Sequence, residues 1–147
     1  MTSSDNTERL IGVAKQYFEE VDQGQLPLQL FRSDFSFYFP KYGIGQGADE
    51  FREFGGGLWK AGYKAQHHRE QLKYTAAGKT VVVEGTTQGS DGAGRTWNGG
   101  VTPGGRFLSI FEFDDEGLIE RMFIYLDPDY TSLDQGRFHW TRANEKW

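Results

Sequence analysis

The chain has 147 residues, a formal net charge of −5 and no cysteine. Its length suits one domain with a substantial core, and the missing cysteines exclude disulfides and thiolate metal sites. Because Lys and Arg form no cluster along the chain, we expect no nucleic-acid partner.

The sequence predicts a single domain over residues 1–147, in which residues 128–147 form a C-terminal tail. The amino-terminal stretch MTSSDNTERL lacks the positive start and the apolar core of a signal peptide. No apolar run approaches the roughly 20 residues that a membrane-spanning helix needs. We therefore expect a soluble, cytoplasmic protein that does not enter a membrane.

Three helices are predicted in the first half of the chain. Residues 6–23 carry apolar side chains at helical spacing, and Asp5 followed by Glu8 resembles a capping box. The stretch LPLQLF, residues 26–31, predicts a short second helix with proline in its first turn. A third helix is expected to begin near Asp49, and the glycines at 55–57 predict that it is kinked or mobile there.

Strands are predicted around these helices and after them. The stretch FSFYF alternates so that Phe35, Phe37 and Phe39 share one face. After Tyr63 the chain reads as four consecutive strands, AQHHREQLKYT, VVVEGTTQGS, GRFLSIFEFD and LIERMFIYLD. Tight turns are expected at AAGK and DDEG, and a long glycine-rich loop between residues 89 and 105. Helices followed by consecutive strands predict an α+β domain.

The last two strands are apolar on both faces. The side chains at positions 107, 109, 111 and 113 oppose Leu108 and Ile110, and Phe123 and Tyr125 oppose Ile124 and its neighbours. A sheet with one solvated face alternates apolar and polar residues, and the helices can cover only one side. The pattern therefore predicts a homodimer that packs through the outer sheet face.

Several local stretches resemble a known superfamily. They are QYFEEVDQG in the first helix, SDFSFYFP in the first strand and the FDDEGLIERMFIYLD hairpin. Together with the order of elements over residues 6–130, they resemble the nuclear transport factor 2-like superfamily, more closely its SnoaL-like and ketosteroid-isomerase-like branch. The resemblance implies a cone-shaped, cystatin-like fold, in which a strongly curved antiparallel sheet wraps around the N-terminal helices and leaves a deep pocket. The Phe35, Phe37 and Phe39 face would then be either one wall of that pocket or ordinary core.

The resemblance carries three positions over from the steroid isomerases. Tyr17 stands where the family's helix tyrosine donates a hydrogen bond to the developing oxyanion. Phe39 stands in place of the general-base aspartate, and Arg106, or Ser109 in a shifted register, stands in place of the second, protonated aspartate. Because a phenyl ring cannot transfer a proton between carbons, we expect no ketosteroid isomerase activity by that mechanism.

Three further polar groups are candidates for chemistry under this resemblance. The isomerase register turns Glu84 and Arg106 inward, either as a pair that orients a ligand or as a structural ion pair. It also turns His68 inward, where related dehydratases place a histidine suited to acid-base catalysis; a structural histidine is the alternative. Asp127 lies on the strand where SnoaL-like cyclases carry an acid-base aspartate, but the isomerase register turns it outward, and Asp-Pro also favours a turn.

The remaining candidate residues would contact a ligand. Trp97 lies in the glycine-rich loop, where it suits a lid over the pocket mouth. Trp59, Leu108 and Ile124 are further candidate ligand contacts. No metal-ligand spacing occurs in the sequence, so we expect neither a metal nor another cofactor.

Three functions remain open. The first is an enzyme that performs proton-transfer chemistry, such as cyclisation, dehydration or isomerisation, on a small hydrophobic substrate, with Tyr17 as hydrogen-bond donor and His68 or Asp127 as base. The second is a non-catalytic module that binds a ligand in the same cone. The third is a dimeric protein-interaction domain whose cavity is vestigial.

Overall fold

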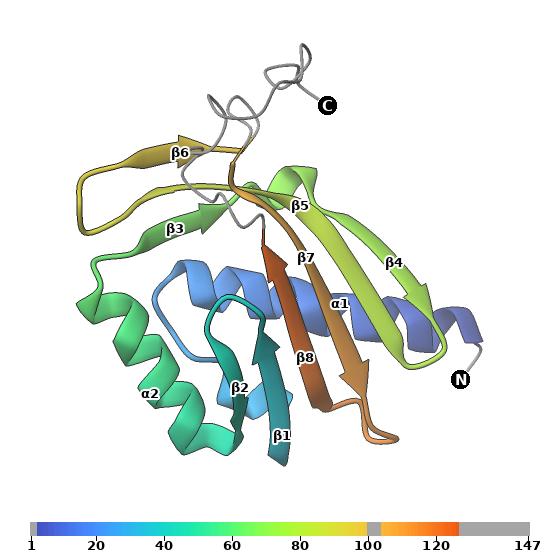
Figure 1. Cartoon of the computed structure of the whole chain (residues 1–147). Helices are drawn as coiled ribbons and strands as arrows, with labels where there is room; N and C mark the ends of the chain where they lie inside the picture. Colours follow the sequence, from blue (N-terminus) through green and yellow to red (C-terminus); the bar gives the residue numbers. More distant parts are fainter. Residues whose placement is uncertain (1–2, 100–103, 127–147) are drawn as a thin grey trace.

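The computed structural model describes residues 3–99 and 104–126. In this part of the chain two α-helices and two short 3-10 helices accompany eight strands (Figure 1). In chain order they are α1 (Ser3–Asp22), η1 (Leu28–Leu30), β1 (Phe31–Phe39), β2 (Gly43–Gln46), α2 (Gly47–Lys60), β3 (Lys64–His67), η2 (Arg69–Gln71), β4 (Lys73–Ala77), β5 (Thr80–Ser90), β6 (Thr96–Asn98), β7 (Arg106–Phe113) and β8 (Ile119–Leu126).

The strands form one curled, open sheet, which confirms the predicted α+β class. The strand order is β2-β1-β8-β7-β5-β3, and β4 and β6 also pair with β5. Pairing is antiparallel except between β1 and β8, which run parallel with Phe37 opposite Met122. The predicted curved, antiparallel sheet is therefore mixed at this one junction. Here the first strand of the chain pairs with the last strand of the β5-β7-β8 meander.

The core lies between α1 and the concave face of the sheet (Figure 1). Apolar residues at helical spacing place Leu10, Ala14 and Phe18 on one side of α1, where all three are buried. On the sheet, alternate residues of β5 and β7 are buried on the side that faces α1. They include Val81 and Phe111, which lie opposite each other on the two strands. We call this side of the sheet the inner face, and the side away from α1 the outer face.

Burial along β7 alternates strictly between the two faces. Positions 107, 109, 111 and 113 are buried on the inner face, whereas Arg106 and Leu108 lie on the outer face and are only partly buried. On β5 the core residues Val81 and Val83 likewise leave Glu84 on the outer face, opposite Leu108. The expectation that Glu84 and Arg106 turn inward is therefore wrong. No ion pair joins them in the described structure, and Thr86 is the residue opposite Arg106.

The stretch predicted as one strand over AQHHREQLKYT is broken at His68. β3 pairs with the second half of β5 and β4 with its first half, and η2 spans the bend between them (Figure 1). Gly85 lies at this bend, where a Cβ atom would be 2.3 Å from Leu72 Cδ2. Leu72 can approach the sheet only because position 85 has no side chain.

Two further elements differ from the sequence prediction. The helix expected to be kinked at its glycines runs without a break from Gly47 to Lys60. The expected glycine-rich loop contains β6, which pairs with β5 through Trp97 opposite Gly89. The short strand β2 was not predicted, because GIGQ has few strand-forming residues and becomes a strand only by pairing with β1.

Candidate functional site

The three phenylalanines of β1 form a continuous aromatic surface on the inner face. Phe35, Phe37 and Phe39 are all buried, as their alternation predicts. Two rings from α2 cover them: Phe51 lies 5.1 Å from Phe37, and Phe54 lies 5.1 Å from Phe39, centroid to centroid. These separations are those of favourable aromatic pairs. The rings therefore form part of the core on the inner face.

Tyr17 lies in the middle of this aromatic interior. It leaves α1 toward the sheet and packs edge-on against Phe31 and Phe111, with centroid distances of 6.0 and 5.2 Å. Burial, and to a lesser degree the carboxylate of Asp22, raise the pKa of the Tyr17 hydroxyl well above its ordinary value. The phenol therefore stays protonated and can act as a hydrogen-bond donor over the whole physiological pH range.

A buried aspartate joins the end of α1 to the end of β3. The Asp22 side chain is only 3% exposed, and its Oδ1 lies 2.6 Å from His67 Nδ1. The backbone N–H of His67 donates to both carboxylate oxygens at 3.2 Å. Arg69 Nε lies 3.5 Å from Oδ2, and Gln66 Nε2 donates to the Asp22 carbonyl at 2.7 Å. The carboxylate is thus held by several donors from one short segment.

The imidazole of His67 is oriented by this carboxylate and by two aromatic rings. Its centroid lies 4.8 Å from that of Phe18 and 5.0 Å from that of Phe107. An ionised carboxylate only accepts hydrogen bonds, so Nδ1 carries a proton, and in the neutral form of the ring the lone pair is on Nε2. The His67 side chain remains 20% exposed. Asp22 and His67 therefore form a pair in which one ring nitrogen is fixed and the other is poised to accept a proton.

His68, the histidine expected to point inward, occupies a different environment. It follows β3 directly, and its Nδ1 lies 2.6 Å from the hydroxyl of Thr86, a residue on the outer side of β5. The inward position belongs to its neighbour His67. The prediction failed because the register taken from the isomerases, which turned both His68 and Glu84 inward, is off by one residue: His67 lies opposite Thr87, which is buried.

The other predicted site residues are dispersed. Trp97 is buried in β6, and its Nε1 donates to Thr87 Oγ1 at 3.0 Å, so the ring is a fixed part of the sheet and not a lid. Trp59 is 75% exposed near the end of α2. Ile124 lies on the inner face opposite Ser109, whereas Leu108 lies on the outer face.

The two residues carried over as alternatives from the isomerases, Arg106 and Ser109, lie on opposite faces of β7. Ser109 is buried on the inner face, whereas Arg106 lies on the outer face. Asp127 lies outside the described residues. Among residues 3–99 and 104–126, no group of three or more His, Asp or Glu side chains could hold a metal ion. No helix in the described ranges is long and apolar enough to span a membrane.

Comparison with known sequences identifies the family. The family profile for the SnoaL-like domain matches residues 14–122, which is most of the chain. The chain belongs to the SnoaL-like domain family. No curated protein is similar enough in sequence to match it.

Several solved structures share the fold of this SnoaL-like protein. A candidate polyketide cyclase from Xanthomonas campestris pv. campestris is 21% identical with a TM-score of 0.71, over 83% of this chain and 93% of that chain. An NTF2-like protein from Anabaena variabilis is 25% identical with a TM-score of 0.68, over 89% and 96% of the two chains. The epoxide hydrolase/cyclase-like enzyme SalBIII is 16% identical with a TM-score of 0.60, over 87% and 95%. These likenesses confirm the predicted nuclear transport factor 2-like fold.

Proposed function

We propose that this SnoaL-like protein binds a small hydrophobic molecule against its aromatic inner face and performs cofactor-independent proton-transfer chemistry on it. The observation that carries the proposal is the Asp22–His67 pair, because a buried carboxylate fixes the ring that would move the proton. The reaction class is cyclisation, dehydration or isomerisation. Cyclisation gains support from the similar structures of a candidate polyketide cyclase and of SalBIII, an epoxide hydrolase/cyclase-like enzyme.

Each of these residues would have a separate role in the reaction. His67 Nε2 accepts a proton from the substrate, and the Asp22 carboxylate stabilises the imidazolium that forms. Tyr17 remains a neutral donor because of its raised pKa, so its hydroxyl suits an oxygen on which negative charge develops. Phe39 supplies apolar contact where an isomerase has its base, so ketosteroid isomerisation by the two-aspartate mechanism is not the expected reaction.

The first experiment measures thermal unfolding of the full chain with flat apolar ketones, phenols and polyketide-like acids. A ligand at 100 times its Kd adds about 2.7 kcal/mol to the free energy of unfolding, which raises the Tm by roughly 5–11 °C for a chain of this size. Compounds that raise the Tm are then incubated with the protein, and product formation is followed.

Variants of the adjacent residues His67 and His68 form a matched pair that tests the catalytic part of the proposed function. His67→Gln should lower turnover by about 10²–10⁴-fold, the usual contribution of a general base, while keeping the ligand-induced rise in Tm. His68→Gln should leave turnover unchanged. Loss of turnover in His68→Gln or Asp127→Asn, with His67→Gln fully active, would refute the assignment of the base. Ligands that bind without any turnover would instead indicate a non-catalytic binding module.

The outer sheet face supports a second part of the proposal, a homodimer. Phe123 and Tyr125 stack there with an interplanar angle of 12°, and Tyr38 meets both rings edge-on. The three rings lie on neighbouring strands β1 and β8 and cover the sheet on the side that no described helix occupies. Tyr125→Glu should convert a dimer to a monomer in sedimentation velocity. Tyr42→Glu, which changes a similarly exposed tyrosine elsewhere, should leave the dimer intact.

A further inference from the structure

A groove on the surface lies between β2 and α2, and it shares no lining residue with the Asp22–His67 pair. Its volume is about 440 Å³. Phe37, Tyr42 and Phe54 line it together with glycines of β2 and α2. Phe37 is only 4% exposed, so Phe54 and Tyr42 supply the accessible aromatic surface. This volume is in the range of small-ligand sites, and the lining combines apolar rings with a few charged groups.

Glycine explains how the groove is built. A Cβ atom at Gly45 would lie 2.2 Å from the Phe37 ring, so the ring rests directly against the backbone of β2. On the opposite side a Cβ atom at Gly57 would meet nothing within 4 Å, and Gly57 lines the groove. A side chain at position 57 would therefore begin in open space at the side of the groove.

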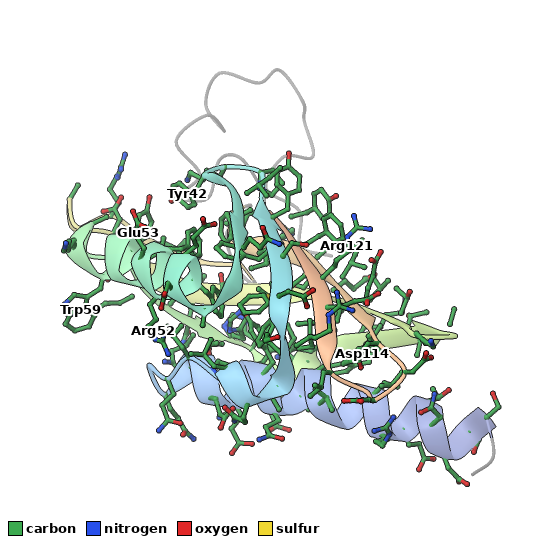
Figure 2. The ribbon with its side chains drawn as sticks, turned by 90° about the horizontal axis from the view of Figure 1, so that it is seen from below. Tyr42, Arg52, Glu53, Trp59, Asp114 and Arg121 are labelled. Carbon is green, nitrogen blue, oxygen red and sulfur yellow. The ribbon has the colours of Figure 1, made fainter. Side chains whose placement is uncertain are left out.

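The charges around the groove are unequal. Glu50 and Glu53 both line it and lie one turn apart on α2. Glu50 accepts the backbone N–H of Gln46 at 2.5 Å, and Glu53 makes no ion pair within the described structure. Figure 2 shows Glu53 on the side of α2 that faces Tyr42, whereas Arg52 projects elsewhere and pairs with Asp49 at 2.8 Å.

Among the described residues, Lys41 brings a cation close to the lining residue Tyr42. Its ammonium lies 5.8 Å from the centroid of the Tyr42 ring. The α2 side therefore offers two carboxylates beside apolar rings, and the β1–β2 turn offers one ammonium. A ligand that lies in the groove next to α2 meets negative charge.

We propose that this groove binds an organic cation, a flat hydrophobic amine whose apolar body lies on Phe54 and Tyr42. Its ammonium lies between the Glu50 and Glu53 carboxylates, and the rings contribute a cation–π interaction. This proposal goes beyond the acid-base function of the Asp22–His67 pair and does not depend on it, and Phe37 is the residue that the groove and the inner face share. The groove selects for positive charge, so a carboxylate of the same shape is repelled.

The test compares three probes of one shape that differ only in charge: 2-naphthylmethylamine, 2-naphthylmethanol and 2-naphthoate. Binding to the full chain is followed by two-dimensional NMR, in which glycine amides fall in a characteristic region. The amine should bind more tightly than the alcohol, and the alcohol more tightly than the carboxylate. Shifts should concentrate at Gly43, Gly45 and Gly57.

Matched variants test the two parts of the site. Gly57→Leu should abolish amine binding by filling the groove, whereas Gly56→Leu, whose Cβ also meets nothing within 4 Å, should leave it unchanged. Both replace a helical glycine and should fold, which the Tm of each variant checks. Glu53→Gln should weaken amine binding about 2–5-fold, the value of an exposed charge pair, and leave alcohol binding unaltered.

Three results would overturn the proposal. One is equal affinity for the amine and the carboxylate, or no binding of the amine at millimolar concentration. Another is amine binding that survives Gly57→Leu. The last is a shift pattern centred on Gly85 and Gly89, which would show that the amine enters the inner face and not the groove.

Discussion

Removing the Asp22 carboxylate should destabilise the protein far more than removing an exposed one. In Asp22→Ala the His67 amide loses its acceptor at 3.2 Å, and the ring Nδ1 loses its acceptor at 2.6 Å. Hydrogen bonds to charged groups contribute about 1.5–3 kcal/mol each, and partners left buried add to the cost. The half-exposed Arg69 adds little, because exposed ion pairs contribute about 0–1 kcal/mol.

We therefore expect Asp22→Ala to lower the free energy of unfolding by about 3 kcal/mol, which allows for partial access of water. For a chain of this size the Tm should fall by roughly 6–12 °C. Urea denaturation followed by tryptophan fluorescence measures the change. Asp49→Ala serves as the control, since that carboxylate is 99% exposed and its pair with Arg52 should contribute less than about 0.5 kcal/mol.

A double-mutant cycle separates the Asp22–His67 interaction from the packing of each residue. His67→Ala alone also removes ring contacts with Phe18 and Phe107, so its single effect is mixed. If the pair interacts as the geometry indicates, the double variant should be less destabilised than the sum of the single variants by about 1–2 kcal/mol. Additivity within about 0.5 kcal/mol would refute the reasoning, as would a loss in Asp22→Ala no larger than that in the control.

Three other predictions concern single residues. Burial raises the pKa of Tyr17 above its ordinary value, so the unfolded chain releases this proton at lower pH than the folded chain. The free energy of unfolding should therefore fall as pH rises above about 10. Tyr17→Phe should make that decline shallower in urea melts recorded at several pH values. Gly89→Ala should lower the free energy of unfolding by about 3 kcal/mol or prevent folding. The reason is that its Cβ would lie 2.1 Å from the Lys64 carbonyl oxygen and 2.6 Å from the Trp97 ring. A Tm near that of the parent protein would contradict this packing. Gly56→Ala should raise stability by about 0.5–1 kcal/mol, because its Cβ is unobstructed in a helix interior, and calorimetry showing a lowered Tm would count against a regular helix there.

The sequence was sufficient to predict elements that depend on local periodicity. Spacing along α1 predicted its buried side, and alternation along β1 predicted that Phe35, Phe37 and Phe39 share a face. Local pattern could not reveal which face of β5 and β7 is inner, because both faces of β7 carry apolar residues and only packing against α1 distinguishes them. The resemblance to the isomerases supplied a register, and for Glu84 and Arg106 that register was wrong.

The candidate site depended on tertiary structure that no local signal contained. Asp22 appeared only as the end of a helix, and its partner lies 45 residues further along the chain. His67, and not His68, lies on the inner face because the register taken from the isomerases was off by one residue along β5, where His67 pairs with Thr87. An isolated Asp and a His at the ends of two elements indicate a contact only once those ends are known to meet.

The parallel pairing of β1 with β8 has a consequence for synthesis on the ribosome. Phe37 pairs opposite Met122, so about 85 further residues must emerge before β1 acquires this partner. At the usual synthesis rate of 5–20 residues per second, one edge of the aromatic stretch FSFYF has no strand partner for roughly 4–17 s. Such uncharged, aromatic strands aggregate readily when exposed. Nascent chains arrested between residues 60 and 115 should therefore recruit chaperones more strongly than chains arrested before residue 30, and their solubility should recover only when β8 has been made.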